Sequence, residues 1–168
     1  MYPYYSQPDL VLSVRVFVSV MSSIGVLFLG IITYVLTKSI WTANLTVVLV
    51  SLSELYSYHS RAYVNLDIFA TFFVIVNILY LVCFYKKNSI ILSVLIPGVL
   101  TGLAIASKYP HGLIIIPHLW KLSQYYLSKP SKLIIQAIGV LVISITTMFL
   151  FMPYALIFNE RWISGLLA

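Results

Sequence analysis

Long apolar runs, separated only by short polar breaks, constrain this chain more than any other feature of its sequence. Stretches of about 18 or more apolar residues are long enough for a helix to cross a hydrocarbon core of roughly 30 Å. Of the 168 residues, 61% are hydrophobic and 8% are charged. A water-soluble domain could not cover its surface with so few charges. The runs also lack the strict alternation of membrane β-strands, so we predict an all-α, multi-pass membrane protein.

The apolar runs predict a bundle of about six transmembrane helices that form a single domain, residues 1–168. The breaks between the runs are too short to fold by themselves, and no internal repeat is visible. The expected helices are Val11–Leu36, Trp41–Tyr58, Leu66–Tyr85, Ile90–Ser107, Tyr109–Leu127 and Leu133–Phe158.

The charges separate when the breaks are placed alternately on the two sides of a membrane. One side receives basic residues and no acid: Lys38, Lys86, Lys87, Lys121, Lys129 and Lys132. The positive-inside rule makes this side cytoplasmic. The other side, which is periplasmic, extracellular or lumenal, receives all four acids together with the remaining basic residues: Asp9, Glu54, Asp67, Glu160, Arg15, Arg61, Lys108 and Arg161. The basic residues form no continuous stripe, so nucleic acid is not an expected partner.

The polar segment YSYHSRAYVNLD, residues 56–67, is the first candidate site. Arg61 is a candidate ligand for a phosphate, and Asp67 or Glu54 would hold its guanidinium. His59 could donate or accept a proton near neutral pH. Helix capping is the competing explanation, since an acid such as Asp67 stabilises the positive end of the helix that follows. Ionisable groups at membrane depth favour the functional interpretation.

The segment GLAIASKYPHG, residues 102–112, is the second candidate site. Lys108 follows a long apolar run, and Pro110 with Gly112 predicts a break in the helix immediately afterwards. Such a break at the outer face could line a polar cavity. The alternative is that Lys108 reaches the lipid head groups and that the break is only a turn. If Lys108 and Arg61 share a cavity, they would form a phosphate clamp.

Two further patterns are assigned to structure and not to chemistry. Gly98, Gly102 and Ala106 recur every four residues, a spacing that lets membrane helices approach closely. His111 and His118 lie seven residues apart, but no acid or cysteine stands at ligand spacing, so we predict no metal site.

The order of these motifs resembles the middle of the polyprenyl-phosphate-sugar-dependent membrane glycosyltransferases. This superfamily, which has the GT-C fold, includes the protein O-mannosyltransferases and the lipid A aminoarabinose transferases. The motif around Ser60, Arg61 and Asp67 matches one loop of the family, and residues 102–109 match the end of one of its helices. The resemblance covers roughly residues 12–153.

The resemblance implies transfer of a sugar from a polyprenyl phosphate to a protein, glycan or lipid acceptor at the outer face of the membrane. Arg61 and Lys108 would bind the donor phosphate, with His59, Glu54, Asp67 and Tyr109 in support. No cofactor is expected beyond this lipid-linked donor. In the family, the main catalytic acid lies on an outer loop after a first transmembrane helix. We expect both to precede residue 1, so the chain would be a fragment whose catalytic acid is unassigned.

Two other functions fit the sequence. A transporter or channel module could use the break at Lys108 and Pro110 as a substrate site between discontinuous helices. A non-catalytic scaffold subunit could use the Gly98, Gly102 and Ala106 face to pack on another membrane protein.

Overall fold

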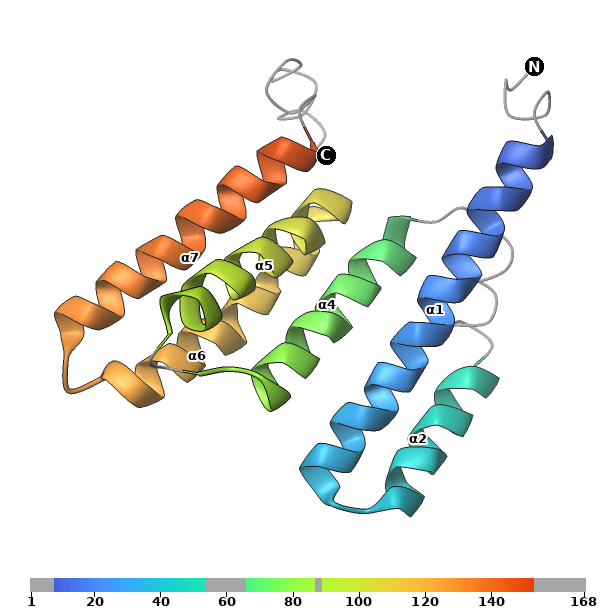
Figure 1. Ribbon diagram of the computed structural model, residues 1–168, viewed down its shortest axis with the longest axis horizontal. Coiled ribbons are helices and arrows are strands. Elements are labelled where there is room, and N and C mark those ends of the chain that lie inside the picture. The colour runs from blue at the N-terminus through green and yellow to red at the C-terminus, as the bar shows by residue number, and fades with distance from the viewer. Residues whose placement is uncertain (1–7, 54–65, 87–88, 153–168) are drawn as a thin grey trace. The chain divides into compact units, whose positions relative to one another are not determined.

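The described part of the chain is helical throughout its regular structure. The computed structural model describes residues 8–53, 66–86 and 89–152, and within these ranges it has six α-helices and no strand (Figure 1). This confirms the predicted all-α fold. The chain divides into two compact units, Met1–Phe84 and Tyr85–Ala168, which are described separately.

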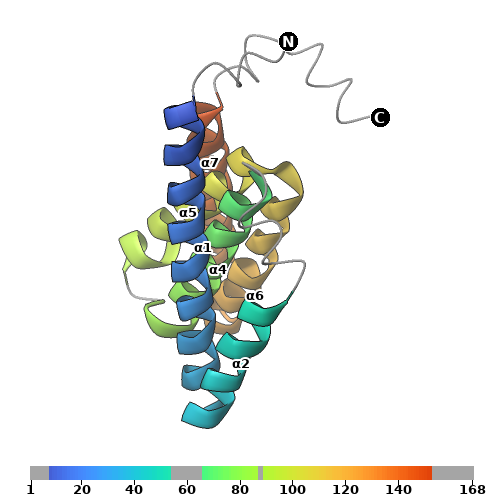
Figure 2. The same cartoon turned by 90° about the vertical axis from the view of Figure 1, so that its right-hand side faces the viewer.

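The first unit begins with a helical hairpin formed by α1 (Pro8–Thr37) and α2 (Ile40–Leu52). The turn depends on Lys38, which has a positive φ of 56° and donates its backbone N–H to the Tyr34 carbonyl oxygen at 2.8 Å. The Ser39 hydroxyl then accepts the Thr42 backbone N–H at 3.3 Å and caps α2. The two helices lie side by side (Figure 2).

Aromatic contacts attach α4 (Leu66–Cys83) to α1. The ring centroids of Phe17 and Phe69 lie 6.0 Å apart, and those of Phe28 and Phe72 lie 6.1 Å apart. Residue numbers increase in the same direction along both helices, so α1 and α4 are parallel. The beginnings of α1 and α4, which carry Arg15 and Asp67, therefore share one end of this unit, and Lys38 lies at the other end.

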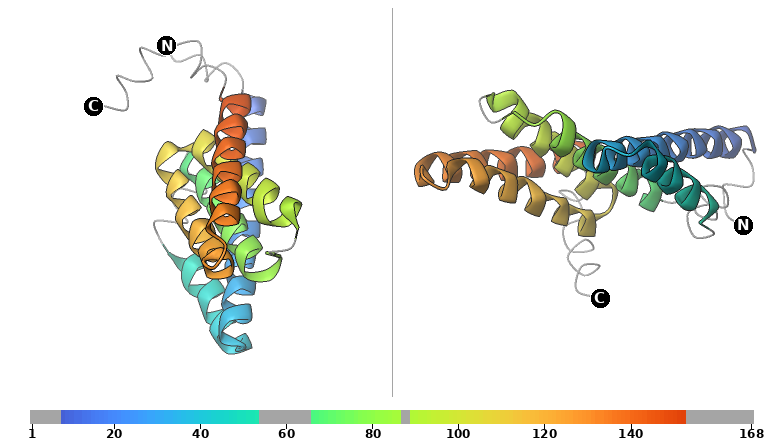
Figure 3. Two further views of the ribbon diagram at one scale, coloured as in Figure 1. Left: turned by 90° about the vertical axis from the view of Figure 1, so that its left-hand side faces the viewer. Right: turned by 90° about the horizontal axis from the view of Figure 1, so that it is seen from below.

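The second unit is organised around a close contact between α5 (Ile96–Ser107) and α7 (Pro130–Phe151), which Figure 3 shows side by side. A Cβ atom added at Gly98 would lie 2.7 Å from Ile143. One added at Gly102 would lie 2.5 Å from the Thr147 side chain and 2.6 Å from the Ser144 carbonyl oxygen. Only glycine permits these approaches. Gly98 lies near Ile143 and Gly102 lies near Thr147, so residue numbers increase in the same direction along both helices. The helices α5 and α7 therefore run parallel.

Two short irregular helices precede and follow α5. A π-helix, η2 (Ile91–Leu95), leads directly into α5, and a 3₁₀-helix, η3 (Tyr109–Ile114), follows it. The predicted helix Ile90–Ser107 is thus confirmed, with a π-turn that was not anticipated. Its position agrees with Pro97, which has no N–H to donate to the carbonyl group four residues earlier.

Residues 109–127 differ from the single membrane helix that the sequence predicts. They form η3 followed by α6 (Ile115–Tyr126), a helix of 12 residues. At 1.5 Å per residue, α6 is about 18 Å long, well short of a hydrocarbon core. One face of α6 buries His118 and Leu122, whereas Ile116 and Trp120 are exposed. The difference arises where Lys108 leaves α5 in an extended conformation and Pro110 stands in the first turn of η3.

Among the residues that the structure describes, two helices are long and apolar enough to cross a membrane, Leu12–Thr37 and Pro130–Phe151. Of the most apolar 18-residue stretch in each helix, only 33% and 22%, respectively, is buried. Large apolar side chains such as Leu36, Ile135 and Leu150 are exposed along them. Neither helix therefore resembles the buried core helix of a soluble protein. Three shorter apolar helices accompany them: Ile40–Leu52, Asp67–Cys83 and Ile91–Ser107.

The α5–α7 contact predicts that Gly102→Ala destabilises the second unit. The added methyl group would meet the Ser144 carbonyl oxygen, which belongs to the backbone and cannot move away by changing a rotamer. We expect a loss of about 1–3 kcal/mol in the free energy of unfolding, measured by reversible unfolding of the detergent-solubilised protein. The matched control is Gly112→Ala, because the atoms found near its added Cβ belong to the Ile105 side chain. Equal stability of the two variants would contradict this account of the contact.

Candidate functional site

The turn after α5 is the candidate site that the structure describes most fully. The helix ends at Ser107, and Lys108 takes an extended conformation with φ −160° and ψ 119°. The Lys108 N–H donates to the Ala104 carbonyl oxygen at 3.0 Å, and its own carbonyl oxygen accepts the His111 N–H at 3.0 Å. The predicted break is therefore confirmed. Lys108 and Tyr109 are both exposed, so the turn presents an ammonium and a phenol side by side in sequence.

His111 adds a polar group to this turn, although its sequence pattern suggested no role beyond a weak metal pair with His118. Its Nδ1 atom is buried and has no hydrogen-bond partner in the structure. A buried polar atom without a partner is uncommon and often marks a functional position. The sequence signal that could have identified it is its place between Pro110 and Gly112, directly inside the break. His118 lies elsewhere, on the buried face of α6.

Asp67 lies in the first turn of α4, where a carboxylate is stabilised by the positive end of the helix dipole. This position agrees with the capping explanation and leaves the carboxylate partly accessible. The other residues of the same candidate cluster, Arg61, His59 and Glu54, lie outside the described residues. Their roles stay predictions.

The structure groups some of the candidate residues within a unit. Lys108, Tyr109 and His111 share one turn of the second unit, and Asp67 belongs to the first. Among the residues that the structure describes, no three His, Cys, Asp or Glu side chains gather in a way that could hold a metal ion.

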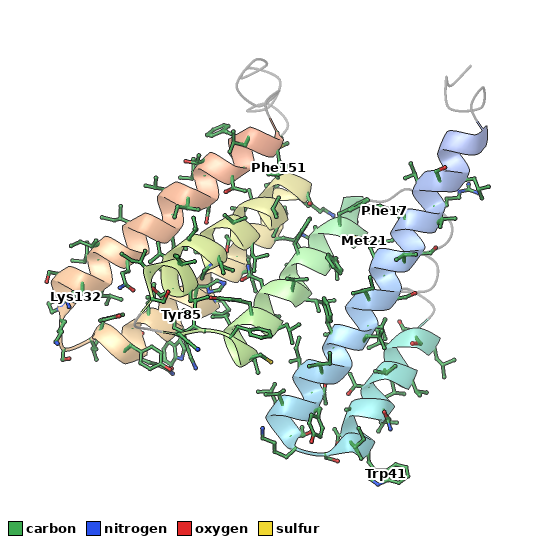
Figure 4. The ribbon with its side chains drawn as sticks, in the orientation of Figure 1. Phe17, Met21, Trp41, Tyr85, Lys132 and Phe151 are labelled. Carbon is green, nitrogen blue, oxygen red and sulfur yellow. The ribbon has the colours of Figure 1, made fainter. Side chains whose placement is uncertain are left out.

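Three described lysines of the second unit, Lys108, Lys129 and Lys132, lie at its two opposite ends. Because α5 and α7 run parallel, Lys108 at the end of α5 is level with the end of α7. Lys129 and Lys132 lie at the beginning of α7. Figure 4 shows Lys132 and Phe151 at opposite ends of this helix. The tertiary structure thus reproduces, within this unit, the separation of lysines that the sequence predicts.

Within the described residues, these features define an all-helical protein with two helices apolar enough to cross a membrane and a cationic turn at one helix end, as expected of an integral membrane protein. A comparison with protein families identifies the particular family: the model for dolichyl-phosphate-mannose-protein mannosyltransferases matches residues 1–165. The chain belongs to this family. Membership places it among the integral membrane glycosyltransferases that use a polyprenyl-phosphate-linked sugar, as the motif order predicts. Comparisons with curated proteins and with solved structures found no match.

The opposite positions of Lys108 and Lys129 predict opposite labelling from the two sides of a membrane. We expect a membrane-impermeant maleimide to label Lys108→Cys from the outer side and Lys129→Cys from the cytoplasmic side of oriented vesicles. Both variants carry Cys83→Ser, because Cys83 is an exposed free thiol. The vesicles are broken open as a control for total reactivity. Labelling of both positions from one side would contradict the arrangement.

Proposed function

We propose that this protein transfers mannose from a polyprenyl phosphate to a hydroxyl group of a protein acceptor at the non-cytoplasmic face of the membrane. The observation that carries the proposal is the family match over residues 1–165, with Lys108 in an exposed turn at the end of α5. The name of the family includes both the dolichyl-phosphate-linked mannose and the protein acceptor.

The reaction forms a bond between the acceptor oxygen and the anomeric carbon of mannose, and it breaks the bond between that carbon and the phosphate oxygen. The acceptor proton passes to a general base, and polyprenyl phosphate leaves with its electron pair. The chemistry therefore needs cationic groups where negative charge develops on the departing phosphate. No residue of this chain is assigned as the base.

Lys108 is suited to bind the departing phosphate. Its ammonium is a compact point charge on a long, flexible stem, a type of group that commonly binds phosphates. The extended backbone at Lys108 and the turn that follows place Tyr109 and His111 next to it in the chain. The Nδ1 atom of His111 is buried at this turn and has no hydrogen-bond partner in the structure.

Arg61 is the second proposed phosphate ligand, with Asp67, Glu54 and His59 in support. The proposal rests on the sequence motif and on the position of Asp67 in the first turn of α4, the helix that follows this segment. A second support is position. Asp67 and Arg15 share one end of the first unit, and Lys38 lies at the other end. In a multi-pass chain the positive-inside rule would place this end of the first unit on the outer side.

The interruption of α5 also fits a transporter with a site at Lys108 and Pro110. Family membership favours the transferase. The scaffold alternative loses its main support, because Gly98 and Gly102 already pack against α7 in the same chain. Release of free sugar or lipid on the far side of sealed vesicles, without modification of an acceptor, would favour transport.

The proposal predicts that Lys108→Ala and Arg61→Ala each lower kcat/KM for the lipid-linked donor by about 10–100-fold, since a hydrogen bond to a charged group contributes about 1.5–3 kcal/mol. Transfer of labelled mannose from polyprenyl phosphate to a serine- or threonine-containing peptide would be measured in membranes from expressing cells. Lys108→Arg should retain part of the activity because it retains the charge.

Lys86→Ala is the matched control for charge, since Lys86 is also exposed but follows Tyr85, which stacks on Tyr125 at the opposite end of the unit. Its kinetics should equal those of the unmodified protein. Unchanged donor affinity and rate in both Lys108→Ala and Arg61→Ala would refute the assignment of the phosphate ligands.

A further inference from the structure

A pocket of about 690 Å³ lies at the end of the second unit that is remote from Lys108. It is bordered by the end of α6, the turn that follows, and the beginning of α7. Its lining includes Tyr125, Tyr126, Lys129, Lys132, Ile135 and Gln136. Figure 4 shows Lys132 and Tyr85 at this end of the unit. The pocket is large enough for the head group of a lipid and belongs to a different region from the proposed donor site.

The electrostatics of this pocket favour an anion. Lys129 and Lys132 stand three residues apart and are both exposed. The ammonium of Lys121 lies 5.8 Å from the centre of the Tyr125 ring, which brings a third positive charge to the pocket wall. The sequence has no acidic residue between Asp67 and Glu160. Within the described part of the unit, therefore, no carboxylate neutralises these lysines.

Gln136 sets a second requirement for the ligand, because its Oε1 atom is buried and has no hydrogen-bond partner. Gln136 lies one helical turn beyond Lys132 and lines the same pocket. A buried carbonyl oxygen without a donor costs free energy unless a ligand satisfies it. A suitable ligand thus carries a negative group for the lysines and a hydroxyl group that can donate to Gln136.

The surroundings of the pocket are those of a membrane interface. Tyr85 stacks on Tyr125, with ring centroids 6.0 Å apart and an angle of 10° between the rings. Tyrosine rings are enriched at the level of lipid head groups. Ile90 and Ile135 add apolar surface to the lining, where the glycerol and upper acyl chain of a lipid could lie. Basic pockets on the cytoplasmic side of membrane helices bind anionic head groups.

We propose that this pocket binds a phospholipid whose head group has both a phosphate and a free hydroxyl, taken from the leaflet on the lysine-rich side. Lys129 and Lys132 contact the phosphate, and the Gln136 amide turns so that its Oε1 atom faces the pocket and accepts a hydrogen bond from the hydroxyl. The inference does not depend on the proposed transferase activity, because the pocket lies at the opposite end of the unit from Lys108.

The test uses the whole chain in nanodiscs of phosphatidylcholine with an equal part of phosphatidylglycerol, the probe lipid. Native mass spectrometry would measure how much phosphatidylglycerol stays bound after the bulk lipid is removed. The double variant Lys129→Gln with Lys132→Gln should weaken retention about 30-fold, because each of the two lysines contributes about equally to the attraction of an anionic lipid. Gln136→Leu should weaken it several-fold with no change in net charge.

Lys86→Gln is the matched control, since it removes one exposed charge from the same end of the unit but does not line the pocket. It should retain phosphatidylglycerol as the unmodified protein does. Folding of each variant is checked by circular dichroism and gel filtration. Neither lysine is needed to begin α7, whose N-cap has no side-chain hydrogen bond. Gln136→Leu, which alters no charge, provides a second route if the double variant does not fold.

Three results would overturn the proposal. The first is equal retention by the double lysine variant and the unmodified protein. The second is an equal loss in Lys86→Gln and in the single variant Lys132→Gln, which would indicate general attraction to the charged surface. The third is displacement of phosphatidylglycerol by inorganic phosphate or glycerol 3-phosphate at matching concentrations, which would indicate a soluble ligand.

Discussion

The close approach of α5 and α7 determines the arrangement of the second unit. Within a bilayer, apolar side chains gain little by leaving lipid for protein, so helices associate through tight packing between small residues. Gly98 and Gly102 permit that packing, and Ser144 and Thr147 form the facing surface. Since the two helices run parallel, the intervening chain must return along the unit. That return places Lys108 at one end and Lys129 with Lys132 at the other.

Two prolines interrupt this unit with different results, although both stand at the second position of a new helical segment. Pro97 is the second residue of α5, and the preceding π-helix continues the same rod. Pro110 is the second residue of η3, after Lys108 has left the helix in an extended conformation. The first interruption preserves a long helix, and the second creates an exposed turn at a helix end, where the proposed donor site lies.

Several features were predictable because they depend on local chemistry. The helix expected at Leu66–Tyr85 is observed at Leu66–Cys83, and the helix expected to end at Ser107 ends there. The break at Pro110 follows from a missing N–H group, and the family follows from motif order. The length of the helical segment after the break was not predictable from hydropathy, because residues 109–127 are apolar enough for a long helix. Their division into η3 and α6 reflects local backbone geometry and the burial of His118 and Leu122.

The sequence by itself determined the helical class, the separation of basic and acidic residues along the chain, and the candidate residues Arg61, Asp67 and Lys108. These properties follow from apolar run length, from charge order and from short motifs. Only the tertiary structure decided that Gly98 and Gly102 pack within the chain, that Nδ1 of His111 is buried, and that Gln136 joins Lys129 and Lys132 around one pocket. The physical reason is that burial and pocket formation depend on which helices meet and in which register. The contacts between α5 and α7 join residues more than forty positions apart, and no local pattern specifies them.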